Sequence, residues 1–181
     1  ETVGPDTVAL ELRTPAGFAA DPGQFVLVRG TVDGVEETGY YTLSSPDTEG
    51  TMEITVEAPP EATLAPWLAD RRPGDTVEVE GPFGDVRYTG EGPVAVLAEG
   101  PGIGPAVGIA ERARRAGHDA TVIFEGSDPP HRDRLDALAA DGATVRIVES
   151  VAEATDAVAA AEDADATVYA FGFESFVRAA T

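Results

Sequence analysis

The chain has 181 residues, of which 43% are hydrophobic, so it is long enough to bury a substantial core. Its 33 acidic residues against 12 basic ones, all of them arginine, give a formal net charge of −21, which disfavours nucleic acid and membrane as partners because both require a basic surface. The sequence has no cysteine, which excludes disulfides, thiolate metal sites and a catalytic thiol from these residues, and no apolar run approaches the roughly 20 residues of a membrane span.

The acidic residues are spread along the chain instead of being concentrated in a tail. Self-repulsion of this size disfavours the compact state in dilute buffer, whereas at 1 M salt the Debye length falls to about 3 Å. We therefore interpret the composition as an adaptation to a salt-rich, haloarchaeal-type cytoplasm and expect a cytoplasmic protein. With so many acids any spacing arises by chance, so we assign no metal site.

Short alternating apolar runs, separated by Pro/Gly/Asp turns, dominate the first half of the chain. Such runs are typical of half-buried strands, and several at this spacing predict an antiparallel barrel over residues 1–90. One short helix, Ala62–Ala69, interrupts the series and carries the single tryptophan. The predicted strands are Thr7–Arg13, Phe25–Arg29, Tyr40–Ser44, Met52–Glu57 and Thr76–Glu80.

After a break at residues 89–93, continuous apolar strands alternate with alanine-rich helices. Buried strands with helical crossovers predict a parallel α/β domain over residues 91–181. We expect a ligand in the cleft between the two halves. The predicted strands are Val94–Ala98, Ala120–Phe124, Thr144–Val148 and Thr167–Phe171, and the predicted helices are Pro105–Ala116, Asp133–Ala140, Val151–Ala161 and one that has barely begun at Thr181.

The segment Glu99–Pro105 (EGPGIGP) lies between the first strand of the second half and its helix. Its glycines let the backbone approach a ligand closely, and the helix N-terminus behind it favours an anion such as a pyrophosphate. The segment is not the dinucleotide fingerprint GxGxxG, because residue 105 is proline. A tight turn without a ligand also explains it.

Other candidate residues carry little signal of their own. The segment Gly39–Pro46 (GYYTLSSP) fits either a half-buried strand or a surface for a flat, polar ligand. Trp67 and Phe83, each judged alone, are expected in the core. His118 and His131 have no evident nucleophile or carboxylate partner, so we expect both to be solvent-exposed loop residues.

The order of four motifs is more specific than any one of them. PGQF at 22–25, YYTLSS at 40–45, PGDTVEVEGPFG at 73–84 and LAEGPGIGP at 97–105 together resemble the ferredoxin–NADP reductase superfamily of two-domain flavin reductases. The resemblance covers essentially the whole chain. It implies an antiparallel six-stranded barrel that binds FAD, less often FMN, followed by a parallel α/β domain that binds NADH or NADPH.

The resemblance also implies a reaction, in which hydride passes from the nicotinamide nucleotide to the flavin and electrons pass on to an acceptor such as ferredoxin. It places the first barrel strand of the family before Glu1, and a closing helix and strand after Thr181, so the second domain is expected to be incomplete.

Site residues follow from the resemblance by position. Tyr41 and Thr42 match the tyrosine and the serine or threonine that lie against the flavin, and Thr42, near the reacting edge of the ring, is the catalytic candidate. The remaining flavin-binding candidates are Leu43, Ser44, Val56, Gly81 and Phe83. The candidates for the nicotinamide nucleotide are Gly100, Gly102, Gly104, Pro105 and Gly172.

Some positions depart from the family pattern. Gly39 stands where the family has an arginine that grips the FAD pyrophosphate, and Ala62–Ala65 replaces its Gly-x-x-Ser. Phe171-Gly172-Phe173 replaces Cys-Gly-Pro, and Pro101 replaces a threonine. The aspartate of Ser127-Asp128 disfavours the 2′-phosphate of NADP, which favours NADH slightly.

Three functions are compatible with this pattern. The first is a flavin-dependent oxidoreductase. The second is a non-catalytic binding or regulatory module of the same fold, which Gly39, Ala65 and Phe171 favour. The third is the electron-transfer subunit of a dihydroorotate dehydrogenase-like complex, for which the resemblance implies several cysteines after residue 181.

Overall fold

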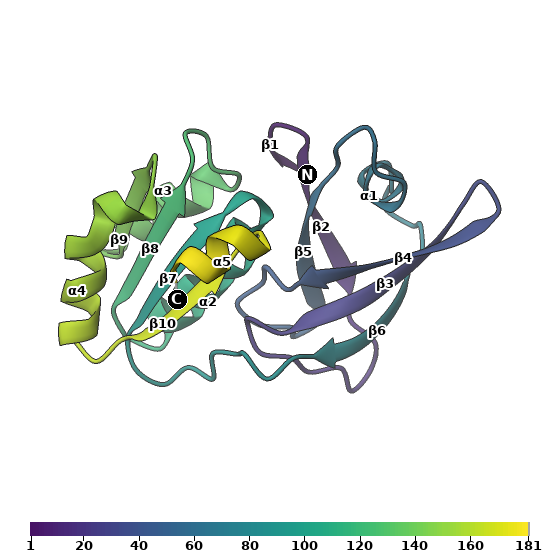
Figure 1. The fold of residues 1–181 in the computed structure, drawn as a ribbon. Coiled ribbons are helices and arrows are strands. Elements are labelled where there is room, and N and C mark those ends of the chain that lie inside the picture. Colours follow the sequence, from purple (N-terminus) through teal and green to yellow (C-terminus); the bar gives the residue numbers. More distant parts are fainter. Residues whose placement is uncertain (181) are drawn as a thin grey trace.

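Six strands make up the first part of the chain: β1 (Thr2–Gly4), β2 (Thr7–Arg13), β3 (Phe25–Val32), β4 (Val35–Thr42), β5 (Thr51–Glu57) and β6 (Glu78–Phe83). The structure is a computed structural model that describes residues 1–180. The strands form two antiparallel sheets with the orders β1-β2-β5 and β4-β3-β6 (Figure 1). An isolated bridge between Leu43 and Ile54 joins the two sheets just after β4 ends.

The core of this barrel forms because alternate side chains of each strand point inward. The short helix α1 (Leu64–Ala69) packs against the strands and contributes two buried leucines, while Trp67 packs against the core from the side. Fully buried members of the core include Val26, Val28, Leu43, Ile54, Val56 and Leu68.

The second part of the chain contains a four-stranded parallel sheet. Its strands are β7 (Val94–Glu99), β8 (Ala120–Glu125), β9 (Thr144–Val148) and β10 (Thr167–Phe171), in the order β10-β7-β8-β9. β7 is fully buried along most of its length, as expected for a central strand that is covered on both faces. The predicted order, an antiparallel barrel followed by a parallel α/β domain, is confirmed.

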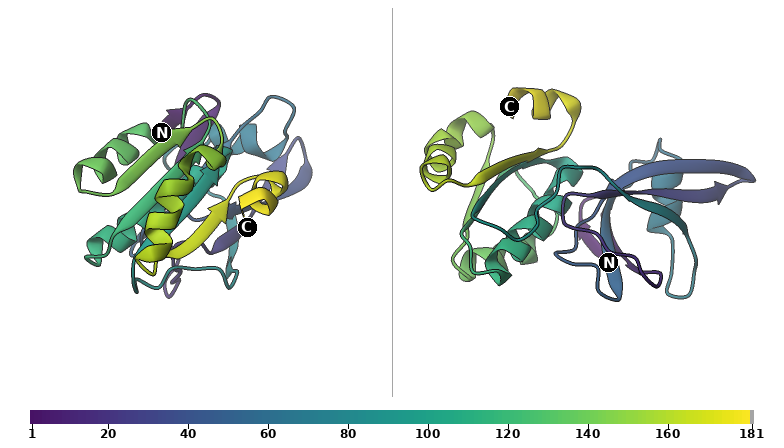
Figure 2. Two further views of the ribbon diagram at one scale, coloured as in Figure 1. Left: turned by 60° about the vertical axis from the view of Figure 1, so that its left-hand side comes forward. Right: turned by 90° about the horizontal axis from the view of Figure 1, so that it is seen from below.

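Helices cover both faces of the parallel sheet. Figure 2 shows α2 (Ile103–Arg115) below the sheet, and α4 (Thr155–Asp163) and α5 (Glu174–Ala180) on the opposite face. Helix α3 (Arg132–Ala140) packs beside α2. Two short 3₁₀ turns, η1 (Gly100–Gly102) and η2 (Val151–Ala154), precede α2 and α4. The turn η1 lies against β5 of the barrel, so the two parts of the chain meet at the glycine loop.

Several boundaries differ from the predicted ones. β3 and β4 extend into a hairpin that turns at Asp33 and Gly34, both with positive φ, and β6 begins two residues later than predicted and ends at Phe83. The helix predicted from Pro105 begins at Ile103, and the one predicted from Val151 starts as a 3₁₀ turn. None of the helices within residues 1–180 has the length and apolar character needed to cross a bilayer.

Candidate functional site

The two tyrosines of β4 lie on opposite sides of the sheet. Tyr41 packs against the barrel core, where a methyl group at Gly39 would lie 2.9 Å from the Tyr41 ring and 3.1 Å from Leu64. Burial raises the pKa of Tyr41. Tyr40 is 70% exposed, and its ring meets Phe25 edge-on with 5.6 Å between ring centroids. The tyrosine ring that β4 offers to solvent is therefore that of Tyr40.

Thr42, the last residue of β4, lies next to an aromatic cluster. It is partly buried and pairs with Phe25 of β3, which also pairs with Phe83 of β6. The rings of Phe25 and Phe83 are tilted against each other with centroids 5.8 Å apart. Gly81 and Gly84, both with positive φ, lie beside these rings. Within residues 1–180 the Thr42 hydroxyl forms no hydrogen bond, so it is available to a ligand.

Three other flavin candidates are fully buried. The side chains of Leu43 and Val56 belong to the barrel core, and Ser44 lies between the two domains. The backbone N–H of Leu43 donates to Gln24, and that of Ser44 donates to Glu53. Any contact of these residues with a cofactor would have to come from backbone groups that are not already hydrogen-bonded.

A buried hydrogen-bond chain crosses from the barrel to the second domain. The hydroxyls of Ser44 and Thr55 are 2.7 Å apart, and Thr55 Oγ1 lies 2.7 Å from His131 Nε2. The expectation that His131 is solvent-exposed is wrong, since it is only 4% exposed. Burial, and then the charge of Arg134, lower the pKa of His131 from 6.5 to about 4. His131 is therefore neutral at pH 7.

Arg134 of α3 reinforces the same contact. Its guanidinium donates to Glu111 of α2 at 2.8 and 2.9 Å, to Glu53 of β5 at 2.7 Å and to the carbonyl oxygen of Ser44 at 2.8 Å. Burial alone would lower the pKa of Arg134, but its bonds to Glu111 and Glu53 raise it. Burial raises the pKa of Glu53, which the attraction of Arg134 opposes only in part.

Two glycines allow helix α2 to approach the barrel closely. A methyl group at Gly104 would lie 2.4 Å from Thr55 Oγ1 and 2.6 Å from Ser44 Oγ, and one at Gly108 would lie 2.7 Å from the Ser44 carbonyl oxygen. Residues four apart share one face of a helix. Gly104, predicted as a nucleotide contact, thus lies against the barrel, and Pro105 beside it is buried.

The rest of the glycine loop packs against the end of β10. A methyl group at Gly102 would lie 2.2 Å from the Phe171 carbonyl oxygen, so this position admits only glycine. Gly100 has a φ of +52° and is partly exposed. A methyl group there would lie 3.3 Å from the ring of Phe173, which is 55% exposed. Gly100 and the neighbouring Phe173 are therefore accessible from solvent at this end of the loop.

Gly172, the remaining nucleotide candidate, packs beside the first strand of the parallel sheet. A methyl group at Gly172 would lie 2.9 Å from the ring of Phe176 and 3.1 Å from Glu99 Cβ. Ser127 and Asp128, which follow β8, are both exposed.

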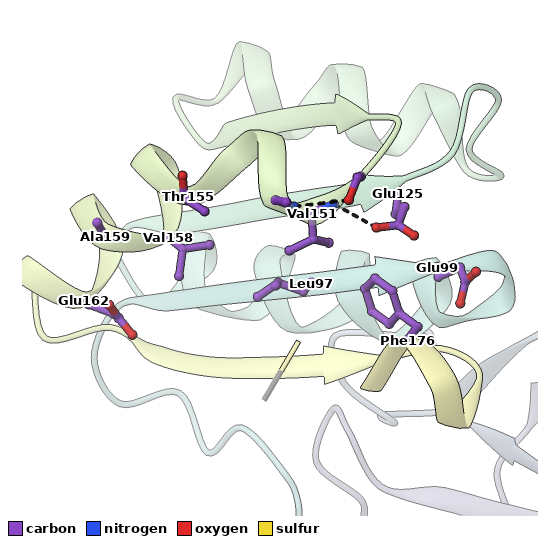
Figure 3. A pocket seen from close by; sticks show the side chains of 11 residues that line it. Leu97, Glu99, Glu125, Val151, Thr155, Val158, Ala159, Glu162 and Phe176 are labelled. Atoms are coloured by element: carbon purple, nitrogen blue, oxygen red, sulfur yellow. Dashed lines mark hydrogen bonds between the residues drawn. The ribbon is translucent and has the colours of Figure 1, made fainter. Parts of the chain in front are cut away.

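A cavity lies within the second domain. It has a volume of about 710 Å³ and opens between the sheet, α4 and α5. Figure 3 shows Leu97 and Val158 on its walls and the carboxylates of Glu99 and Glu125 near one end. Glu125 accepts a hydrogen bond from the Val151 N–H at 2.7 Å, whereas one buried oxygen of Glu99 has no partner.

Sequence reasoning missed the residues that join the two domains. Thr55 and His131 are 76 residues apart, and nothing in their local sequence indicates the contact. Gly108 inside the predicted helix Pro105–Ala116, four residues after Gly104 of the loop, was the one available signal. Within residues 1–180, no three His, Asp or Glu side chains come together to hold a metal ion.

Comparison with known proteins identifies the first domain. Residues 1–88 match the family of oxidoreductase FAD-binding domains. The "Probable dihydroorotate dehydrogenase B (NAD(+)), electron transfer subunit" of Methanopyrus kandleri is 33% identical over 129 residues, which are 71% of this chain and 46% of that protein. An "NADH-cytochrome b5 reductase-like" protein of Mus musculus is 31% identical over 128 residues, 68% of this chain and 40% of that protein.

Solved structures agree on the fold of the whole chain. A ferredoxin-NADP+ reductase structure from Plasmodium falciparum superimposes with a TM-score of 0.80 at 12% identity, covering 97% of this chain and 84% of that one. The chain spans about half the length of the curated relatives it matches.

Proposed function

Because the chain belongs to the ferredoxin–NADP reductase superfamily, we propose that it is a flavin-dependent oxidoreductase that takes electrons from NADH or NADPH. The acceptor in this proposal is a ferredoxin or another electron-acceptor protein. One observation supports it most directly. Strand β4 ends at Thr42, and Ser44, two residues further on, packs against Gly104 at the end of the glycine loop. The flavin candidate and the nicotinamide candidate are therefore neighbours.

The residues around Thr42 fit a flavin ring. Bound flavin would accept a hydride and release it as electrons, which is chemistry that the protein itself lacks. The free hydroxyl of Thr42 would bond to the polar edge of the ring. The exposed ring of Tyr40, with the partly buried rings of Phe25 and Phe83 beside it, is suited to a flat partner. Close packing of the two domains would keep water from the reacting face.

The fit is weaker for the pyrophosphate of FAD. Gly39 supplies no charge, and the first residues of α1, Leu64 and Ala65, are buried in the barrel core. The α1 N-cap, Thr63, makes no side-chain bond to the helix. Affinity for FAD should therefore rest on the flavin ring more than on the phosphates, and we expect FMN to bind as well.

The cavity in the second domain suits NADH better than NADPH. It lies at the carboxyl ends of β7 and β8, where nucleotides bind in open parallel sheets. Glu99 and Glu125 are register neighbours there, and their carboxylates accept hydrogen bonds from ribose hydroxyls but repel a 2′-phosphate. We therefore propose NADH as the preferred donor.

One experiment tests the proposal. The protein is purified in molar KCl, its visible spectrum is recorded, released flavin is identified by mass, and NADH or NADPH is then added anaerobically. We expect a flavin spectrum that bleaches faster with NADH. No flavin band after incubation with excess FAD and FMN would contradict the proposal, whereas bound flavin that neither nucleotide bleaches would support the non-catalytic module.

A second candidate is the electron-transfer subunit of a dihydroorotate dehydrogenase-like complex. The Methanopyrus relative, 33% identical over 129 residues, favours it. Flavin spectroscopy does not separate this role from the first one, but the full gene does. We expect several cysteines after residue 181 in this case, and a coding sequence without them would remove the candidate.

A further inference from the structure

We propose that Ser44, Thr55 and His131 form a positioning network that fixes the strand end at Thr42 against the glycine loop. These residues are predicted neither to touch a cofactor with their side chains nor to take part in chemistry. Their proposed role is to hold the two domains in one arrangement. The role in positioning does not depend on the proposed function, but its consequence for hydride transfer does.

The network lies where the two domains meet. Ser44, Thr55 and His131 are between 0 and 6% exposed, and the bonds between them are both 2.7 Å long. A neutral histidine and two hydroxyls satisfy one another without introducing charge. Because a buried polar group without a partner is costly, separating the domains here would break the bond between Thr55 and His131 and leave both groups to find other partners.

The backbone of His131 is anchored on the barrel as well. Its N–H donates to Val3 of β1 at 2.9 Å, and Gly4 lies against Pro130, at 3.1 Å from the position of an added methyl group. His131 adopts the left-handed conformation, with φ +58° and ψ +33°, immediately before α3. Its ring is thus directed at Thr55 by contacts to a second strand of the barrel.

The network is connected to the positions where we expect chemistry. Ser44 is two residues beyond Thr42, and both hydroxyls of the network pack on Gly104, four residues beyond Gly100. Arg134 also donates a hydrogen bond to the Ser44 carbonyl oxygen. A shift of Thr55 relative to His131 would therefore change the distance between Thr42 and Gly100.

A peripheral ion pair provides a matched control. Arg115 of α2 and Asp47 of the barrel also bridge the domains, at 2.8 Å, but their side chains are 60% and 44% exposed. Exposed pairs of this kind contribute little. Removing the Asp47 charge should leave the domain contact unchanged, whereas removing the Thr55 hydroxyl should loosen it.

The test is hydrogen exchange of the full chain, read by peptide mass spectrometry, for wild type, Thr55→Val, Thr55→Ser and Asp47→Asn. Loss of the buried hydroxyl should speed exchange by about tenfold in residues 43–46, 100–108 and 128–134, with β3 and β8 unchanged. Thr55→Ser and Asp47→Asn should behave like wild type. Ser44→Ala keeps the bond from Thr55 to His131 and should give a smaller increase in exchange. It replaces Thr55→Val in the test if that variant does not fold.

Three outcomes would overturn the proposal. They are exchange in Thr55→Val that equals wild type, an increase spread evenly over the chain, and an equal increase in Asp47→Asn.

A second measurement concerns catalysis and rests on the proposed function. If flavin binds, Thr55→Val should slow its reduction by NADH about tenfold without changing flavin Kd, whereas a change in Kd alone would argue against positioning.

Discussion

In the proposed flavin site, Gly39 of β4 is the position that we expect to lie beside the pyrophosphate of FAD. In Gly39→Arg, the guanidinium can form a charge-assisted bond with the pyrophosphate of FAD, which is worth about 1.5–3 kcal/mol, or roughly ten- to a hundredfold in Kd. The Tyr41 ring must move, because it lies 2.9 Å from the new Cβ, but it is the far end of a flexible side chain. We expect tighter FAD binding and unchanged FMN binding in fluorescence titrations.

The control for this prediction is Gly39→Gln, which adds similar bulk without charge. It should not tighten FAD. If Gly39→Arg tightened FAD and FMN equally, the arginine would be acting on the flavin ring, and the assignment of Gly39 to the pyrophosphate position would be wrong.

His131 makes stability depend on pH. Its pKa in the folded protein is about 4, below the ordinary 6.5, so between these values the unfolded chain binds a proton that the folded chain does not. The free energy of unfolding should therefore fall as the pH drops from 6.5 toward 4 and be level above 6.5. The groups facing the imidazole are Thr55 and the cation Arg134, and burial followed by the charge of Arg134 disfavours the protonated ring.

The size of this effect is about 2 kcal/mol between pH 7 and pH 5. Urea unfolding of wild type and His131→Gln at both pH values measures it, because the difference between the two proteins removes the contribution of the carboxylates. An equal pH dependence in both would show that His131 is not the group responsible.

Residue roles could be proposed from the sequence only where a motif carried them. The role of Thr42 rests on the resemblance and stays a prediction, with which its free hydroxyl is compatible. Ser44 was assigned to the flavin by the same positional argument, but its side chain turns to the second domain. His131 was placed in solvent because its partner, Thr55, lies in a different domain, and no local pattern encodes such a contact.

At the scale of elements, the alternation of apolar and polar residues predicted strands that have one buried face. It did not detect strand segments that have no buried face. The β3–β4 hairpin beyond Arg29 carries Glu36, Glu37 and Thr38 and projects from the barrel in Figure 1, so it has no apolar face to detect. β1 has three residues, too few for any period. The four parallel strands were predicted nearly to the residue because each is a short apolar run bounded by turn residues, although only the central strands β7 and β8 are largely buried.

Helix α2 offers a test in which propensity and packing disagree. In an exposed helix, Gly→Ala stabilises by about 1 kcal/mol. Gly108→Ala should instead destabilise by about 1–3 kcal/mol, because its Cβ would lie 2.7 Å from the Ser44 carbonyl oxygen, and backbone cannot move aside easily. Urea unfolding measures the sign directly.

The reverse substitution at an exposed helix position is the control, because it measures the effect of helix propensity alone on the free energy of unfolding. Ala159→Gly in α4 should lose the ordinary 0.5–1 kcal/mol of helix propensity. A Gly108→Ala protein more stable than wild type would show that α2 does not need close contact with the barrel.

At the scale of the whole molecule, the sequence indicates two domains because its hydrophobic period changes, and a period contains no information on how domains touch. That contact depends on small residues and on paired polar groups, such as Gly104 with Thr55 and Arg134 with Glu53. The residues of this contact are far apart in the sequence and become neighbours only in the folded chain, so their spacing in the sequence does not reveal it.

The net charge of −21 predicts how the whole chain responds to salt. Salt screens two opposing effects, the repulsion among 33 acids and the attraction within ion pairs such as Arg114–Asp119. Exposed pairs are worth about 1 kcal/mol or less each, and with only 12 arginines most acids have no cation to pair with. Repulsion should therefore dominate, and unfolding free energy should rise with ionic strength.

Urea unfolding in 0.1 M and 1 M KCl measures this response, since urea adds no charge of its own. We expect the midpoint to rise by roughly 1 M urea, which is about 2 kcal/mol at an ordinary slope. Screening depends on ionic strength and not on the cation, so NaCl should give the same rise. A midpoint that fell with salt would mean that ion pairs, and above all the partly buried Arg134 cluster, outweigh the repulsion among the acids.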